Sequence, residues 1–180
     1  MSRLLLITDI ESTCWKDDPR QREESEVIEL GSVPYDPDTR CSLGEFQSFI
    51  RPVRHPQLSE FCTRLTTIRQ SQVDESPMFS EVLERLETQF IGDRPVTFAS
   101  WGRYDREQLQ LDCKRHGVRW PFGTKHLNIK QEFAAWKRGR PCGLGQAIAS
   151  WGMAFQGTPH RGIDDARQVA RVYSLLLSRS

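Results

Sequence analysis

The sequence has no CxxC cysteine pair, no long apolar run and almost no net charge, and each absence excludes a class of protein. Five cysteines make an odd set, so a disulfide framework is not expected. The four histidines show no HxxxH or HxxEH spacing that would favour a zinc site. No apolar run approaches the length of a membrane span, and no segment resembles a signal peptide. We therefore expect reduced thiols in a cytoplasmic protein without a membrane partner.

The near balance of charge limits how the protein could bind nucleic acid. With 25 basic and 24 acidic side chains the net charge is +1, so any such binding depends on a local basic surface. One interval around a tryptophan, Trp136, concentrates basic side chains: Lys125, Lys130, Lys137, Arg138 and Arg140. This interval either follows a phosphate backbone or is an ordinary solvated face, and the sequence leaves both interpretations open.

The patterning of the 180 residues fits one domain, residues 1–180, with no internal repeat. Short apolar runs come first and predict three strands in an antiparallel arrangement. Helical and strand-like patterns then alternate. We predict strands at 3–8, 27–35, 46–51, 96–100 and 126–130, a polar turn at 21–25, and helices at 58–64, 80–90, 106–116, 144–151 and 164–177. This order predicts an α/β fold with a mixed central sheet and helices on both faces.

Two acidic residues follow the first apolar run. Asp9 and Glu11 are two residues apart on a predicted strand, so their side chains project from the same face. Carboxylates this close repel one another unless a cation lies between them, and hard oxygen ligands suit Mg²⁺ or Mn²⁺. The alternative is an acidic pair that is simply solvated at the end of a strand.

Three further candidates lie later in the chain. Asp105 stands between a predicted strand and a predicted helix, where aspartate is also a common N-cap. Asp165 lies at the start of the last helix, where acids favour the positive end of the helix dipole. His160 lies in the preceding turn; it is either a polar surface residue or a group that accepts a proton from water.

Motifs spread over nearly the whole chain follow one order. They are Asp9-Ile10-Glu11-Ser12-Thr13-Cys14, Glu26-Val27-Ile28-Glu29-Leu30-Gly31, Phe46-Gln47-Ser48-Phe49-Ile50-Arg51-Pro52, Leu58-Ser59-Glu60-Phe61-Cys62, Leu65-Thr66-Thr67-Ile68, Ser100-Trp101 and Pro159-His160-Arg161-Gly162-Ile163-Asp164-Asp165-Ala166. As a set they resemble the DEDDh group of 3′-to-5′ exonucleases, whose fold is RNase H-like. Within that group the chain looks most like the Eri-type branch, which includes KapD-like bacterial proteins.

The resemblance implies a role for each acid and for the histidine. Asp9, Glu11 and Asp165 would hold a first metal ion, Asp9 would also hold a second, and Asp105 would position a metal through water. His160 would be the general base of this two-metal, Mg²⁺- or Mn²⁺-dependent hydrolysis. The products would be nucleoside 5′-monophosphates. The related tyrosine-type group needs Tyr-x3-Asp, and position 161 is an arginine, which excludes that variant.

The resemblance also implies how the substrate is held. Thr13 would lie near the terminal ribose, and Leu65, Thr66 and Trp101 would frame the terminal nucleotide, although Trp101 is equally well explained as a core residue. Thr67 stands where the family usually has glycine. The implied substrate is the 3′ end of RNA or another single strand. Two alternatives stay open: DNA end processing on the same scaffold, and a nucleic-acid-binding module without catalysis.

Overall fold

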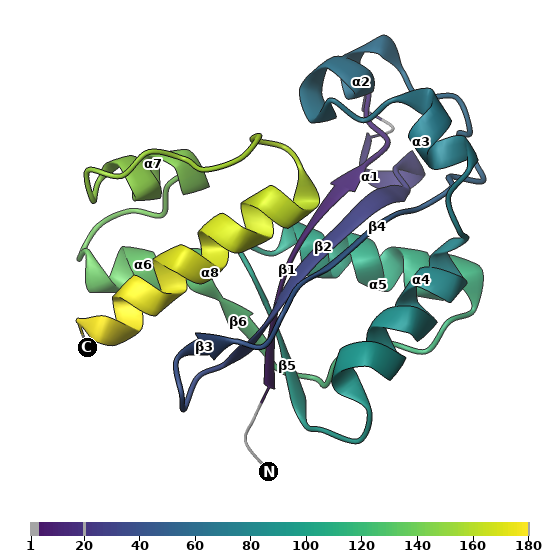
Figure 1. Ribbon diagram of the computed structural model, residues 1–180. Helices are drawn as coiled ribbons and strands as arrows, with labels where there is room; N and C mark the ends of the chain where they lie inside the picture. The colour runs from purple at the N-terminus through teal and green to yellow at the C-terminus, as the bar shows by residue number, and fades with distance from the viewer. Residues whose placement is uncertain (1–3, 20, 180) are drawn as a thin grey trace.

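The computed structural model describes residues 4–19 and 21–179, and its centre is a six-stranded mixed sheet in which β1 pairs with β2 and β5 (Figure 1). The strands are β1 (Leu4–Ser12), β2 (Val27–Asp36), β3 (Cys41–Ser42), β4 (Phe46–Phe49), β5 (Val96–Ser100) and β6 (His126–Asn128). β2 is antiparallel to β1, β3 and β4, whereas β5 is parallel to β1 and to β6. The predicted antiparallel start of the sheet is confirmed. The first residue of the predicted strand 3–8 lies outside the described residues.

Helices cover both faces of this sheet, as predicted, with α4 and α5 on one face and α6, α7 and α8 on the other (Figure 1). In chain order, the helices of the described residues are α1 (Gln21–Glu24), α2 (Glu60–Thr66), α3 (Gln70–Asp74), α4 (Phe79–Leu86), the π-helical turn η1 (Glu87–Ile91), α5 (Tyr104–His116), α6 (Ile129–Trp136), α7 (Leu144–Ala149) and α8 (Gly162–Ser178). Within the described part of the chain, none of these helices combines the length and apolar character that crossing a membrane requires.

The alternation of side chains along β1 determines on which face of the sheet Asp9 and Glu11 lie. Leu4 and Leu6 belong to the core beneath α4 and α5, whereas Leu5 and Ile7 belong to the core beneath α6, α7 and α8. Because successive side chains of a strand point to opposite faces, the odd-numbered Asp9 and Glu11 continue the face that α8 covers.

The start of α8 packs directly on the sheet through two glycines. A Cβ atom on Gly31 of β2 would lie 2.2 Å from the carbonyl carbon of Gly162 and 2.2 Å from the nitrogen of Ile163. A Cβ atom on Gly162 would lie 3.0 Å from the carbonyl oxygen of Asp9. Only side-chain-free residues allow this approach, which brings the first turn of α8, with Asp165, against the end of β1.

Two local predictions differ in part from the structure. The strand predicted at 126–130 ends at Asn128, whose side chain accepts a hydrogen bond from the backbone N–H of Gln131 at 3.3 Å and so caps the unpredicted helix α6. An asparagine at an N-cap stops a strand as effectively as it starts a helix. Residues 21–24, predicted as part of a turn, form the single-turn helix α1, and the short helix α3 was also not predicted.

Candidate active site

A cleft of about 570 Å³ lies where β1 and β5 end and α5 and α8 begin. Its lining comes from four separate parts of the chain: Asp9, Ile10, Glu11, Trp101, Tyr104, Asp105, Leu144, Gly145, Phe155, Pro159, His160 and Asp165. All four predicted acids and the predicted histidine therefore line one cleft. The structure confirms that they come together; their individual roles stay predictions.

The four carboxylates form a cluster with strongly perturbed ionisation. Burial raises the pKa of Glu11 to about 9, that of Asp105 to about 7 and that of Asp165 to about 6. Burial also raises the pKa of Asp9, and the neighbouring charges of Asp105 and Asp165 raise it further. Acids that repel one another in this way are a binding site for positive charge, and oxygen-only donors suit a hard divalent cation. The side chains present fit such an ion.

Asp105 reaches the cluster from the first turn of α5. The N-cap of α5 is Arg103, so the interpretation of Asp105 as an N-cap is wrong. The Asp105 side chain is 6% exposed, and its Oδ1 accepts a hydrogen bond at 3.3 Å from the backbone N–H of Ile10, between the two acids of β1. This contact across the sheet holds the Asp105 carboxylate beside Asp9 and Glu11.

A hydrogen bond joins His160, in the loop before α8, to Asp165 in the first turn of that helix. The backbone N–H of His160 donates to Oδ2 of Asp165 at 2.9 Å. One carboxylate oxygen of Glu11, one of Asp165 and a ring nitrogen of His160 all lie within 4.8 Å of one another. His160 itself is exposed and has a left-handed backbone with φ of 62°. The imidazole therefore faces the carboxylates while it stays accessible to water.

A fifth carboxylate, Glu29, contacts the residues that follow His160 and was not singled out as a site residue from the sequence. Glu29 is fully buried on β2, directly opposite Glu11 in the antiparallel register. It accepts hydrogen bonds from Arg161, from the backbone N–H of Gly162 and from Gln47. The signal in the sequence was a single glutamate inside the apolar run of β2, where an unpaired charge would be costly.

The residues expected to frame a nucleotide are spread more widely. Trp101 lines the cleft, and its indole Nε1 donates to the carbonyl of Cys142 at 3.1 Å. Thr13 and Thr66 are buried, and their hydroxyl groups bond to nearby backbone. Leu65 lines a separate depression on the surface. The nucleotide-binding roles of these four residues stay predictions.

Several walls of the cleft were not expected from the sequence. Tyr104 is a large exposed aromatic residue directly before Asp105, and Phe155 and Leu144 add apolar surface from the α7 region. Tyr104 could have been found from its position beside the acid. Phe155 and Leu144 could not, because only the folding of α7 over the sheet brings them to the cleft.

Comparison with known proteins identifies the family. A family model described as RNase T exonuclease matches residues 6–173. The chain belongs to this exonuclease family. The resemblance to Eri-type DEDDh exonucleases and the RNase H-like fold, both predicted from the motifs, are confirmed.

The relatives are similar to nearly all of the chain. ERI1 exoribonuclease 2 of Homo sapiens is 31% identical over 188 residues, which cover 92% of the chain and 27% of the relative. The 3′-5′ exonuclease Snipper of Drosophila melanogaster is 30% identical over 187 residues, covering 92% of the chain and 66% of that protein. The chain thus spans about a quarter of the human relative's length.

A solved structure shows the same fold. The nuclease domain of 3′hExo, a DEDDh family member bound to rAMP, aligns with a TM-score of 0.88 at 27% identity. The alignment covers 99% of the chain and 92% of that domain.

Proposed function

We propose that this protein is a divalent-metal-dependent 3′-to-5′ exoribonuclease that releases nucleoside 5′-monophosphates from the 3′ end of RNA. The observation that carries the proposal is the convergence of Asp9, Glu11, Asp105, Asp165 and His160 in one cleft. Family membership supports it, as do relatives named for exonuclease activity and a similar domain bound to rAMP.

The carboxylates would hold Mg²⁺ or Mn²⁺, with two ions in the complete site. Asp9, Glu11 and Asp165 would be the ligands of one ion, Asp9 would be shared with the other, and Asp105 would act through water. Bound divalent cations supply positive charge that stabilises the attacking and leaving oxygens of an in-line phosphoryl displacement. The raised pKa values of the carboxyl groups support this assignment, because burial, with repulsion between neighbouring acids, makes the ionised carboxylates unfavourable without a cation.

His160 would act as the general base. Its imidazole accepts a proton from water while the water oxygen bonds to phosphorus. The bond from phosphorus to the 3′ oxygen of the preceding nucleotide breaks, and that oxygen takes up a proton from solvent. The products are a nucleoside 5′-monophosphate and a strand shortened by one residue. The hydrogen bond from the His160 backbone to Asp165 supports this role by fixing the loop beside the acids.

The apolar walls of the cleft suit a terminal nucleotide. Trp101, Phe155 and Leu144 present apolar surface beside the acids. Stacking of a base on an aromatic ring contributes about 1–3 kcal/mol and does not depend on base identity. The same walls would accept a deoxynucleotide, so DNA is the second candidate substrate and the experiment below includes it.

The test uses 5′-labelled RNA and DNA of one sequence with Mg²⁺, Mn²⁺ or EDTA. We expect a ladder that shortens from the 3′ end of RNA, depends on the cation and is absent with Asp9→Ala. Faster shortening of DNA would replace RNA with DNA as the substrate. A gel shift without shortening of either strand would favour the binding module and overturn the enzyme.

A second variant separates the base from the metal ligands. His160→Asn should lower the rate about 10²- to 10⁴-fold, the usual contribution of a general base. Asparagine tolerates the left-handed backbone of position 160, so the fold should persist. If the cation still raises the melting temperature of this variant, His160 is not needed to hold the ion. Loss of that effect would make His160 a metal ligand instead of the base.

A further inference from the structure

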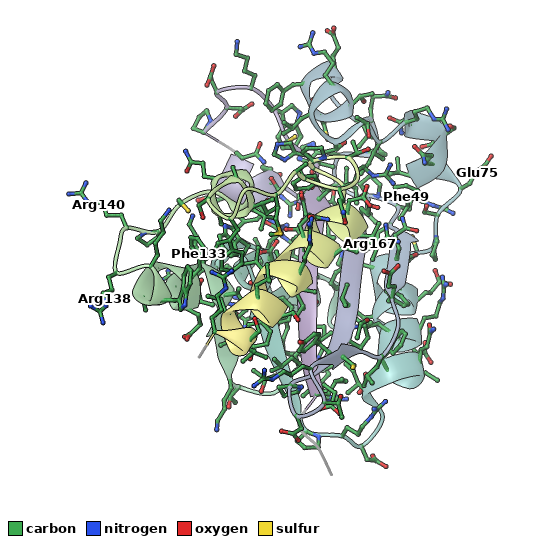
Figure 2. All side chains as sticks on the ribbon, turned by 60° about the vertical axis from the view of Figure 1, so that its left-hand side comes forward. Phe49, Glu75, Phe133, Arg138, Arg140 and Arg167 are labelled. Atoms are coloured by element: carbon green, nitrogen blue, oxygen red, sulfur yellow. The ribbon has the colours of Figure 1, made fainter. Side chains whose placement is uncertain are left out.

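The segment between α6 and α7, residues 137–143, carries the last three basic side chains of the basic interval. We call this segment the α6–α7 loop. Lys137, Arg138 and Arg140 are all exposed. Figure 2 shows Arg138 and Arg140 pointing away from the body of the molecule, while Phe133 of α6 lies inward beneath them. The backbone of the loop is held by hydrogen bonds from Arg138 to Ala135 and from Gly139 to Ala134, at 3.1 and 3.0 Å. These backbone bonds, and not the side chains of Arg138 and Arg140, hold this turn.

The positive charges of this loop lack acidic partners. Among the described residues, no ion pair within 4.0 Å involves Lys137, Arg138 or Arg140. Seven other arginines do form such pairs: Arg54, Arg64, Arg103, Arg115, Arg119, Arg161 and Arg167. Residues 125–140 contain five basic side chains and one acid, Glu132. This local excess of positive charge attracts an anion, and two arginines that are two residues apart suit successive phosphates.

The loop runs directly into the wall of the cleft. The carbonyl of Cys142 accepts the hydrogen bond from the indole of Trp101, and Leu144 and Gly145 line the cleft itself. Leu144 lies four positions after Arg140, a chain length of at most about 14 Å. Stacked nucleotides rise about 3.4 Å each. The guanidinium groups therefore lie within reach of a strand's first few phosphates when its 3′ end is in the cleft.

We propose that Arg138 and Arg140 bind the phosphate backbone of the substrate strand upstream of its 3′-terminal nucleotide. The inference rests on the proposed function for the direction of the strand, but the contact itself is between guanidinium groups and phosphates. Lys137 has a smaller part, because its ammonium group lies 5.9 Å from the ring of Phe133. The contact has no base specificity and makes long single strands better substrates than short ones.

The test compares Arg138→Glu/Arg140→Glu with the wild type on RNA of 2 and of 12 nucleotides. We expect kcat/KM for the 12-mer to fall at least tenfold, while the value for the dinucleotide changes less than twofold. Arg40→Glu is the matched control, since Arg40 is also exposed with a left-handed backbone, at φ of 58° against 52° for Arg138. Arg40 lies near β3, at the end of β2 opposite to Glu29. Equal losses on both substrates, or no loss on either, would overturn the proposal.

A measurement of equilibrium RNA binding tests the contact between the arginines and the phosphates without requiring catalysis. In an Asp9→Asn background, a fluorescent 12-mer RNA is titrated with and without Arg138→Ala/Arg140→Ala at several salt concentrations. Two lost phosphate contacts should reduce the slope of log K against log salt by about 1.4, from about 0.7 per contact on a single strand. An unchanged slope and affinity would overturn the phosphate contact. If the wild type binds RNA by this loop but shortens no strand, only the proposed catalytic function fails.

Discussion

The guanidinium of Arg161 donates two hydrogen bonds to the buried carboxylate of Glu29, from Nε to Oε2 at 3.0 Å and from a terminal nitrogen to Oε1 at 3.2 Å. The backbone N–H of Gly162 donates to the same carboxylate at 3.1 Å. Glu29 stands opposite Glu11 in the sheet, and Arg161 directly follows His160. One ion pair thus ties the loop of the histidine to the strand beside the acidic cluster.

Removing one partner of this pair should damage both stability and activity. Arg161→Met leaves the fully buried Glu29 without its counter-charge, and such losses reach about 3–5 kcal/mol. We expect the lower end of that range in urea unfolding, because the Arg161 side chain is partly exposed.

A double variant separates stability from positioning. Glu29→Gln/Arg161→Met should recover much of the lost stability, since no unpaired charge remains. Its catalytic rate should stay low, because the loop of His160 is no longer anchored. Full recovery of the rate with the double variant would show that the pair has no positioning role.

The acidic cluster predicts how stability depends on pH without metal. Asp165, Asp105 and Glu11 have folded pKa values of about 6, 7 and 9, against about 4 in an unfolded chain. Between pH 4 and 9 the folded state therefore binds more protons than the unfolded state, so the free energy of unfolding falls as pH rises. Melting temperatures in EDTA should decrease over this window. A constant or rising melting temperature would contradict the perturbed pKa values.

A bound divalent cation should reverse that loss. At about 100 times its Kd a ligand adds about 2.7 kcal/mol, which corresponds to roughly 5–10 °C in a domain of this size. The increase should be larger at pH 8 than at pH 5, because the cation competes with protons for the carboxylates. Asp9→Asn should raise the melting temperature in EDTA at pH 8, by removing a carboxyl group that burial and the neighbouring acids make unfavourable to ionise, and should abolish most of the increase on adding the cation.

The contact between Gly31 and α8 predicts a large effect of one methyl group. Gly31→Ala would place Cβ 2.2 Å from the backbone of Gly162 and Ile163, and no side-chain rotation relieves a clash with backbone. Overpacking usually costs about 1–3 kcal/mol, and here we expect about 3 or more, with loss of activity as Asp165 moves away from β1.

The matched control is Gly139→Ala, whose Cβ has its nearest neighbour at 3.9 Å. It should change stability by no more than about 0.5 kcal/mol in urea unfolding. Equal stability of the two variants would show that the approach of α8 to the sheet is looser than the structure has it.

Thr67, which stands where a glycine was expected, has a backbone conformation that favours glycine. It is the C-cap of α2 with φ of 62°, a left-handed conformation that favours glycine and is unfavourable for a β-branched residue. Because its side chain is exposed, Thr67→Gly loses little packing and should raise the free energy of unfolding by about 1 kcal/mol. Thr67→Asn should give a smaller gain. A lower melting temperature for the glycine variant would contradict this account.

Much of the fold and of the site could be predicted because it depends on local pattern. The short apolar run within 3–8 predicts a buried strand. The two-residue spacing of Asp9 and Glu11 puts both carboxylates on one face wherever that strand lies. The helix ended by Gly117 was equally clear, since a left-handed residue closes it. Motif order predicted the family, because the short motifs from Asp9 to Asp165 follow one another in the order typical of DEDDh exonucleases.

Tertiary structure decided what depends on contacts between distant segments. A hydrogen bond across 95 positions brings Asp105 to β1, and an ion pair across 132 positions anchors the loop of His160. No local pattern distinguishes an ordinary N-cap aspartate from one buried among three other acids. The raised pKa values, the helix that begins after Asn128 and the position of the α6–α7 loop beside the cleft all follow from packing. Burial and charge coupling act through space, so they exist only once the chain has folded.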